Sequence, residues 1–407
     1  MGSWAPRWVL ALAVAAGVRA APWRSGDGVT GCSVRVTGDL PEPQPLLLEP
    51  RGSPDVFGFK LPALPGNTLL FRRGEEVALS CVGATNHVTA LAACAQDTTF
   101  VVAGARRNFS ELACEQYPFH TARRTGALCN AGRATEIEIG FSLGARFYRL
   151  LEVCFDEALL SPVYTRFLMV AQIRNYQSRF PRPAWTTGDF YRGVSPNSRY
   201  VRNQQIATVG EILGDVALAE KYISRSSDYF LARGHLAAKV DFLYGAQQRA
   251  TFYYVNAAPQ WQTFNGGNWE RLESSVRAYA TLTASDLVVY TGVHGVSTLP
   301  DAAGVQRELY LHVDENGNRG MPVPRLYWKA VYNPRTRAGA VFLGVNNPYE
   351  ASPGADYFLC RDVSGRMPWL LWSPDNQTLG FAYACEVDDF RRAVPVLPWF
   401  PVDSLLE

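Results

Sequence analysis

Residues 229–242 read YFLARGHLAAKVDF, and residues 251–273 read TFYYVNAAPQWQTFNGGNWERLE. These two segments decide the predicted fold and carry the candidate chemistry, because both enclose polar and ionisable side chains within apolar residues. The residues on either side of them supply the surrounding strands, helices and an accessory segment.

His235 is the candidate general base of the first segment. It follows Arg233 and Gly234. The glycine permits an unusual backbone conformation or the close approach of a ligand, and the arginine adds a fixed positive charge. An imidazole can remove a proton from water near neutral pH. A lone histidine beside leucine is also common as a structural residue, and this alternative stays open on the residues alone.

The second segment predicts a helix that begins at Asn265, since Asn is a favourable N-cap residue. One apolar stripe of this helix consists of Trp269, Leu272, Val276 and Tyr279. Asn265 and Glu273 are eight residues apart, which places them roughly 80° apart around a helix. An amide oxygen together with waters and a substrate phosphate suits Mg²⁺. The alternative is that Asn265 only caps the helix and that Glu273 pairs with Arg277.

Both segments resemble the DNA/RNA non-specific endonuclease family, the ββα-metal nucleases that include the Serratia-type and mitochondrial endonucleases. Within it, they are most similar to the secreted, double-strand-preferring nucleases of crustaceans. The family motif Asp-Arg-Gly-His is matched by residues 232–235, and a strand ending in Asn-x-x-Pro-Gln is matched by residues 256–260. The metal-binding asparagine and the glutamate eight residues later are matched by Asn265 and Glu273.

The resemblance implies a role for each matched residue. His235 is expected to be the general base, Asn265 the metal ligand and Glu273 a catalytic residue that orients metal-bound waters. The implied cofactor is Mg²⁺, with Mn²⁺ as a substitute. Contacts with nucleic acid are expected from Arg233, Asn256, Gln260 and Arg192. Ala232 stands where the family has aspartate, which puts the supporting role of that carboxylate in doubt.

The family also uses an arginine upstream of the histidine to stabilise the transition state, and Arg182 is the match proposed for this catalytic role. A neighbouring arginine is an alternative match. The run of arginines comprises Arg174, Arg179, Arg182, Arg192, Arg199 and Arg202. Such a run is commonly a solvated face, and beside this motif it is a candidate phosphate groove.

The predicted fold class is α+β, with a ββα-metal nuclease core at residues 134–400 in which helices flank a central antiparallel sheet. Residues 21–133 hold five cysteines and short apolar runs, which predicts a β-rich, disulfide-stapled module. A short tail follows at residues 401–407. Hydrophobic periodicity predicts a helix near residues 204–219. Strands are expected at residues 136–140, 147–155, 251–255, 287–291, 325–332 and 339–344.

The N-terminus predicts export. Residues 1–20 have the layout of a signal peptide with cleavage before Ala21, and their apolar run is too short for a membrane anchor. Eight cysteines then predict disulfides, of which Cys360 to Cys385 is the pair indicated by position. The sequons at Asn108 and Asn376 also fit a glycoprotein. We expect a secreted, extracellular protein with no membrane contact.

The charge of the chain excludes a globally basic binder of nucleic acid. The whole chain is formally +2, and removal of Arg7 and Arg19 with the signal leaves 37 basic and 37 acidic residues. Attraction for phosphate must therefore come from a local patch. Of the 39 basic residues, 35 are arginine, whose planar guanidinium can bind phosphate through two hydrogen bonds.

The expected function is that of a secreted, metal-dependent endonuclease that hydrolyses phosphodiester bonds of DNA and leaves 5′-phosphate ends. Duplex preference and cleavage of RNA are open at this stage, as is the oligomeric state. One alternative is a catalytically silent, secreted protein that binds nucleic acid or another polyanion on a nuclease scaffold. A second is a phosphodiesterase or phosphatase that acts on small substrates.

Overall fold

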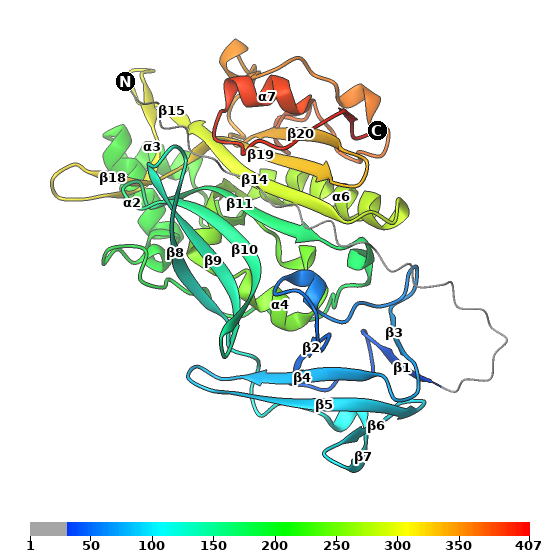
Figure 1. Ribbon diagram of the computed structural model, residues 1–407. Helices are drawn as coiled ribbons and strands as arrows, with labels where there is room; N and C mark the ends of the chain where they lie inside the picture. Colours follow the sequence, from blue (N-terminus) through cyan, green and yellow to red (C-terminus); the bar gives the residue numbers. More distant parts are fainter. Residues whose placement is uncertain (1–30) are drawn as a thin grey trace, which may run out of the picture.

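A nine-stranded sheet lies at the centre of the structure, a computed structural model that describes residues 31–407 (Figure 1). Its order is β21-β20-β19-β14-β11-β10-β9-β8, and β22 pairs in parallel with β20. The other pairs in the sheet are antiparallel. The strands are β8 (Thr121–Cys129), β9 (Ala134–Leu143), β10 (Arg146–Asp156), β11 (Ser161–Met169), β14 (Leu287–Val296), β19 (Pro324–Asn333), β20 (Ala338–Val345), β21 (Ala382–Cys385) and β22 (Ser404–Leu405).

Both faces of the central strands are buried, because side chains alternate between two apolar cores. In β19, Tyr327 and Val331 join the core beneath helix α6 (Glu270–Leu282), whereas Trp328 and Ala330 join the core beneath helix α7 (Val387–Ala393). Helices therefore cover opposite faces of an antiparallel sheet (Figure 1). The predicted α+β fold class, with a central antiparallel sheet and flanking helices, is confirmed.

The N-terminal part is β-rich and cross-linked, as predicted. A five-stranded sheet in the order β2-β4-β5-β6-β7 packs beside the pair β1-β3. The disulfide Cys32–Cys94 links β1 to β5, and Cys81–Cys114 links β4 to the loop that follows β7. The strands are β1 (Cys32–Arg35), β2 (Leu46–Leu48), β3 (Thr68–Phe71), β4 (Glu76–Val82), β5 (His87–Gln96), β6 (Thr99–Val102) and β7 (Ala105–Asn108).

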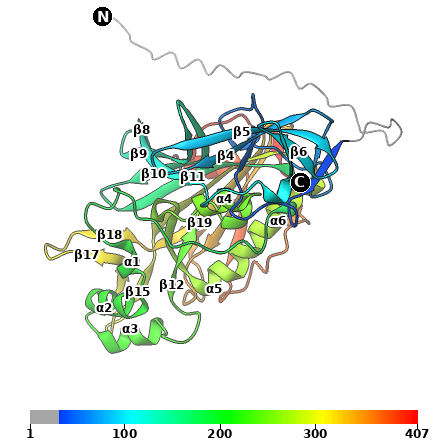
Figure 2. The same ribbon diagram turned by 90° about the horizontal axis from the view of Figure 1, so that it is seen from below.

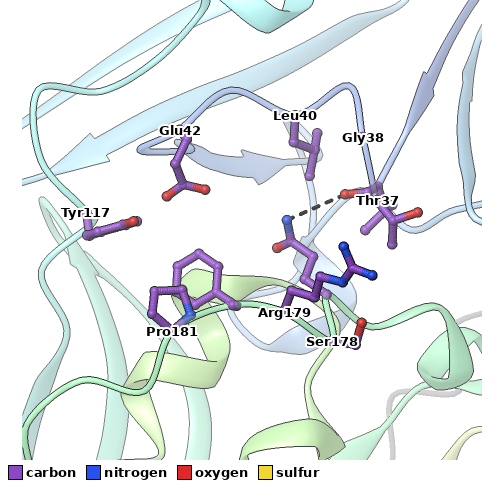
Figure 3. A pocket seen from close by; sticks show the side chains of 11 residues that line it. Thr37, Gly38, Leu40, Glu42, Tyr117, Ser178, Arg179 and Pro181 are labelled. Carbon is purple, nitrogen blue, oxygen red and sulfur yellow. Dashed lines mark hydrogen bonds between the residues drawn. The ribbon is translucent and has the colours of Figure 1, made fainter.

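Gln177 connects this N-terminal module to the body of the protein (Figure 3). Its Oε1 accepts hydrogen bonds from Gln44 Nε2 at 2.9 Å and from the backbone N of Gly245 at 2.6 Å, and its Nε2 donates to Val36 O at 3.5 Å. One side chain thus joins the module to helix α4 (Gly245–Ala250).

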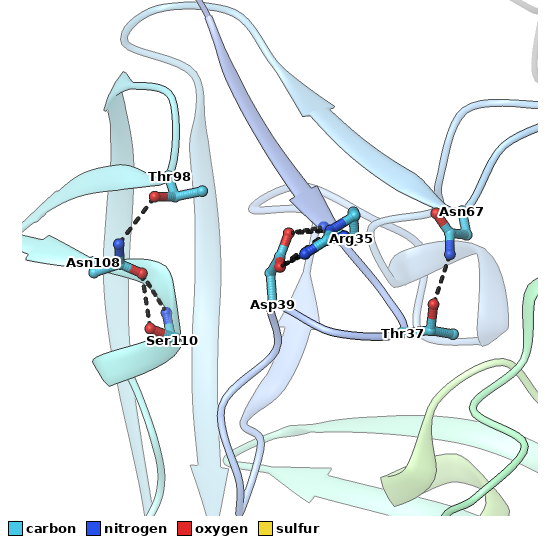
Figure 4. A network of polar contacts seen from close by, with 7 residues as sticks. All are labelled: Arg35, Thr37, Asp39, Asn67, Thr98, Asn108 and Ser110. Carbon is cyan, nitrogen blue, oxygen red and sulfur yellow. Dashed lines mark hydrogen bonds and ion pairs between the residues drawn. The ribbon is translucent and has the colours of Figure 1, made fainter.

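Side-chain hydrogen bonds also fix the turns of the module (Figure 4). The Arg35 guanidinium donates to both carboxylate oxygens of Asp39, and Asn67 Nδ2 donates to Thr37 Oγ1 at 2.7 Å. The exposed Asn108 bonds to Thr98 and Ser110. Loops that lack regular structure are held in place by these local contacts.

Strand β8 precedes the boundary predicted between residues 133 and 134, yet it pairs with β9 in the central sheet. The disulfide Cys129–Cys154 links β8 to β10. The sheet therefore takes nine residues from the segment predicted as accessory. The predicted pair Cys360–Cys385 is confirmed, and no free cysteine occurs among residues 31–407.

Two local predictions are wrong for identifiable reasons. The helix expected at residues 204–219 is two helices, α2 (Arg202–Leu213) and α3 (Val216–Tyr222), because Gly214 has φ of 70° and Asp215 caps the second helix. The strand expected at residues 251–255 is absent, and a 3₁₀ turn at Tyr254–Asn256 occurs there. The apolar run at this place is buried without belonging to a sheet.

The remaining elements complete the periphery. Helices α1, α2 and α3 gather near the β15–β18 arm, away from the N-terminal module (Figure 2). The predicted signal peptide at residues 1–20 lies outside the described residues, and no helix within residues 31–407 has the length and apolarity needed to cross a membrane. The remaining helix and strands are α1 (Pro196–Arg199), β15 (Thr298–Pro300), β16 (Gln306–Glu308), β17 (Tyr310–Val313) and β18 (Arg319–Pro322).

Candidate active site

A β-hairpin followed by a helix positions His235. Strand β12 (Leu231–His235) pairs antiparallel with β13 (Ala257–Trp261), and Gly234 lies opposite Ala258. A Cβ atom on Gly234 would lie 2.3 Å from Gln260 Oε1 and 2.8 Å from Tyr327 Oη. Only glycine fits this close approach of strand and side chains, so the Gly beside His235 is required by packing.

Aromatic side chains pack on two sides of the half-buried His235 ring. The ring centroid lies 4.5 Å from that of Trp185 and 4.9 Å from that of Phe252. Backbone hydrogen bonds from Thr186 N to Phe252 O, at 2.8 Å, and from Tyr254 N to Thr186 O, at 3.0 Å, hold the tryptophan segment in place. The orientation of the imidazole is therefore set by packing.

The same surroundings keep His235 neutral. Burial, followed by the charges of Arg182 and Lys239, lowers the pKa of His235 to about 3. A neutral imidazole keeps one nitrogen lone pair free to accept a proton. Its Nε2 is buried without a hydrogen-bond partner among residues 31–407. The predicted Arg182 is exposed and lies close enough to His235 for its charge to act on the ring.

Asn265 is not an N-cap residue, contrary to the helix start predicted for it. Its φ and ψ are −57° and −47°, within the helical region, and short helix α5 (Gln262–Phe264) precedes it. A π-type segment (Asn265–Trp269) then kinks at Gly267 and continues as α6. Asn265 Nδ2 donates to Gln262 Oε1 at 3.1 Å. Its Oδ1 accepts no hydrogen bond within the described residues, so it is free to act as a ligand.

Glu273 lies in a cluster of four ionisable side chains beneath the hairpin. Arg277 Nη1 donates to Asp241 Oδ1 at 2.8 Å, and these side chains are only 7% and 1% exposed. Asp241 lies six residues after His235, so the pair connects the base-carrying segment to α6. The predicted alternative, in which Arg277 pairs with Glu273, gives way to the pair with Asp241.

Burial, and then the charge of Asp241, raises the pKa of Glu273 to about 7. Two cations offset the two carboxylates, since Lys329 and Arg277 both lower the pKa of Glu273. Lys329 is 1% exposed and donates from Nζ to Thr291 Oγ1 at 2.6 Å. It lies on the face of β19 that supports α6, between Tyr327 and Val331. The buried charges thus sum to zero when all four groups are ionised.

The donor set fits a hydrated Mg²⁺ ion. Within residues 31–407, no three His, Cys, Asp or Glu side chains cluster in a way that would hold a metal without further ligands. Asn265 instead offers a free amide oxygen, and Glu273 lies two helical turns further along the same helical run. Mg²⁺ commonly keeps several waters and takes one or two protein oxygens, so this sparse set suits it.

Two of the four predicted nucleic-acid contacts are buried, which corrects the expectation for them. Asn256 is 0% exposed, and its amide bonds to the backbone of Ala237 and Thr251. Gln260 is also 0% exposed. Asn256 therefore fixes the loop after His235, and Gln260 packs under Gly234. The reason is that the turn at Tyr254–Asn256 and strand β13 are both buried in the body of the protein.

The two arginines predicted to bind nucleic acid occupy different places. Arg233 is half-buried and donates to Tyr254 Oη at 3.0 Å and to Asn197 Oδ1 at 2.9 Å. Its position on the strand that carries His235 keeps it next to the site. Arg192 is exposed and pairs with Glu157 at 3.5 Å. No hydrogen bond or ion pair connects Arg192 to His235 within the described residues.

The side chain of Gln260 has no hydrogen-bond partner for either amide atom among residues 31–407. Gln260 lies directly opposite Ala232 in the hairpin, and directly opposed residues place their side chains on the same face. The family's aspartate would therefore stand beside this amide. Ala232 explains why a buried amide lacks a partner here.

Three residues of the site were missed by the sequence analysis. Trp185 lies three positions after the arginine matched to the family, and Asp241 lies within the quoted histidine segment, so both had a positional signal. Lys329 had a weaker signal, as a single charge in the strand LYWKAVY. Trp261 and Trp269 are 0% and 2% exposed and belong to the core.

Replacement of Trp185 by Ala is expected to raise the pKa of His235 from about 3 toward the ordinary value of 6.5, because the ring loses one desolvating neighbour. Trp185→Phe keeps an aromatic face and should keep the pKa low. NMR titration of the histidine rings measures both, with His235→Gln for assignment. An unchanged pKa in Trp185→Ala, with His294 also unchanged, would refute the proposed shielding.

Loss of the buried ion pair between Asp241 and Arg277 is expected to destabilise the fold. Asp241→Ala leaves Arg277 buried without its partner and should lower the free energy of unfolding by about 3 kcal/mol. Arg277→Met should do likewise, and the double variant should cost less than the sum of the two. Urea unfolding gives these values, with Glu220→Ala in the exposed pair with Arg225 as the control, at about 1 kcal/mol or less. Strict additivity would contradict the coupling.

Comparisons with known proteins place this site in a family. The sequence pattern of DNA/RNA non-specific endonucleases matches residues 132–390. A salivary endonuclease of Lutzomyia longipalpis is 27% identical over 360 residues, which cover 87% of this chain and 81% of the relative. Salivary protein Tsal2A of Glossina morsitans morsitans is 22% identical over 379 residues, which cover 90% and 92% of the two chains.

Among solved structures, that of the EndoG/EndoGI complex matches 48% of this chain and 71% of the other at 21% identity. Its TM-score is 0.32, and no argument rests on it. The family pattern, by contrast, spans well over half of the 407 residues and contains the whole hairpin and helix that carry His235, Asn265 and Glu273. The chain therefore belongs to the DNA/RNA non-specific endonuclease family.

Proposed function

We propose that this protein is a secreted, metal-dependent endonuclease that hydrolyses the phosphodiester bonds of DNA and also of RNA, with His235 as general base. The observation that carries the proposal is a neutral imidazole, fixed between Trp185 and Phe252, with the charge of Arg182 beside it. General bases need a free lone pair near the water that they activate. The endonuclease activity named for the Lutzomyia relative supports the same reaction class.

The proposed mechanism assigns one task to each side chain. The imidazole of His235 accepts the proton of the attacking water, and the guanidinium of Arg182 offsets the charge that develops on the phosphate. Asn265 Oδ1 would hold Mg²⁺ or Mn²⁺, and Glu273 would orient nearby water molecules through hydrogen bonds. When bound, the cation supplies Lewis-acid stabilisation of the phosphate and the departing 3′ oxygen. A 5′-phosphate end is the expected product.

Contacts with the substrate are proposed to be mainly to its backbone. Of the arginines near the general base, Arg182 lies in a loop and Arg233 lies on the strand that carries His235, so neither is on a helix that could enter a DNA groove. Backbone contacts position the substrate but carry little sequence information. Sequence preference should be slight, and binding should weaken steeply as the salt concentration rises. The proposal includes a preference for duplex DNA, and this part is supported only by the family resemblance.

Secretion is supported by several independent features. Four disulfides join all eight cysteines, and such bonds persist in oxidising compartments. The sequon residues Asn108 and Asn376 are exposed, as attachment of sugar requires. Two relatives are named as salivary proteins. The signal-peptide pattern of residues 1–20 completes this part of the proposal.

His235→Ala should lower kcat by about 10²–10⁴-fold, because the base is lost while the charges that bind the backbone remain. Cleavage of plasmid DNA, linear single strands and RNA with Mg²⁺, and then with excess chelator, is the measurement. His294→Ala, on strand β14, is the matched control and should cleave normally. If the wild type binds nucleic acid but cuts none of these substrates, the silent-binder alternative replaces the enzyme.

Asn265→Ala should raise the Mg²⁺ concentration needed for half-maximal activity, because the free Oδ1 is removed. Loss of one ligand commonly weakens metal affinity by about tenfold or more. Activity measured across a metal titration gives the shift, and Asn316→Ala in an exposed turn serves as the control. A superimposable titration curve would remove Asn265 as the ligand, even if maximal activity fell.

A further inference from the structure

A cavity of about 540 Å³ lies between the N-terminal module and the loop at residues 177–181 (Figure 3). The module contributes Thr37, Leu40, Glu42 and Tyr117, and the loop contributes Arg179 and Phe180. This volume lies within the range of sites that bind small molecules. The module lies outside the matched family pattern of residues 132–390, so the cavity combines a family element with an addition to it.

The cavity wall is connected to the candidate active site. Lys239 Nζ donates a hydrogen bond to the carbonyl oxygen of Phe180, and the charge of Lys239 acts on His235. Arg182 follows Phe180 by two residues and acts on the same imidazole. Arg182 lies three positions after Arg179, which is at most about 11 Å of extended chain. A DNA strand covers this length in about three nucleotides, at 3.4 Å each.

The two ends of the cavity differ in chemistry (Figure 3). Arg179 and the hydroxyl-bearing Thr37 lie at one end, where they present donors and a positive charge. Glu42 and Tyr117 lie at the other end, and a hydrogen bond with Glu42 raises the pKa of the Tyr117 hydroxyl. Phe180 packs edge to face on Tyr117, with ring centroids 5.4 Å apart. The interior is therefore aromatic, with a cation at one end and a carboxylate at the other.

A nucleotide has the complementary arrangement. Its phosphate is an anion that a guanidinium binds through two hydrogen bonds, and its base has an apolar face that stacks on aromatic rings. A carboxylate accepts hydrogen bonds from N–H groups at the edge of a base. A free phosphate would use only the Arg179 end, and a simple cation only the Glu42 end. Of these candidates, the nucleotide alone engages all three parts of the cavity.

We propose that this cavity is a subsite for one nucleotide of the substrate strand, located within about three nucleotides of the phosphate that faces His235. The subsite rests on the proposed endonuclease function and gives the N-terminal module a part in binding substrate. Arg179 binds the phosphate, Phe180 and Tyr117 contact the base, and Glu42 accepts a hydrogen bond from its edge.

The test compares a long and a minimal substrate with the full-length protein. Arg179→Ala should raise KM for a 20-nucleotide strand by about tenfold and reduce the salt dependence of binding by about one phosphate contact. Turnover of a dinucleotide, which is too short to fill both sites, should change less than about twofold. Arg106→Ala is the matched control, because Arg106 is exposed on strand β7 and lies outside both the arginine run and the cavity.

Glu42→Gln tests the base-recognition end. The wild type should prefer certain bases at one position that flanks its cleavage sites. The variant should weaken this base preference or change the preferred base. Equal losses on the long and the minimal substrate would indicate a structural defect and overturn the subsite. So would an Arg179→Ala variant that behaves like Arg106→Ala.

The subsite and the endonuclease proposal fail in different ways. If the wild type with Mg²⁺ cuts neither substrate, the endonuclease proposal fails. The subsite is then decided by fluorescence anisotropy with a labelled 20-nucleotide strand. Weaker binding by Arg179→Ala than by Arg106→Ala supports it, and equal binding overturns it.

Discussion

The buried ion pair between Asp241 and Arg277 is the interaction on which the candidate site depends. It joins the segment that follows β12 to helix α6, so the strand that ends in His235 and the helix that carries Glu273 are fixed to each other. An ion pair so well shielded from water persists only where its geometry is good. Lys329 supplies a further cation from the sheet below. Apolar packing shapes the site, and the ion pair holds the His235 segment and helix α6 together.

Much of this arrangement was predictable because its signals are local. Alternating side chains indicated β9, β10 and β19, and the apolar stripe of Trp269, Leu272, Val276 and Tyr279 indicated helix α6. The Cys360–Cys385 disulfide followed from position alone. In each case, the relevant physics acts between residues near in sequence or depends on residue type, so one sequence is enough to show it.

Features that depend on depth within the fold were not predictable. Asn256 and Gln260 carry polar groups suited to substrate contact, yet the fold buries both side chains. Lys329 stands in an apolar strand, and its use becomes clear only when the sheet places it beneath Glu273. Trp185 meets His235 because a loop some fifty residues earlier crosses the hairpin. A periodic pattern identifies which residues share a face, but tertiary packing decides what covers that face.

Strand β8 limits where this chain can be divided. A chain that began at residue 134 would leave the backbone donors and acceptors of β9 unpaired along one edge of the sheet. Such an edge can pair with strands of other molecules. The shortened chain would also leave Cys154 as a lone thiol, able to cross-link to another copy. Replacement of the residues before 134 by a segment without an equivalent strand and cysteine would have the same two effects. Strand β8 and Cys129 therefore constrain which N-terminal segments this sheet can accept.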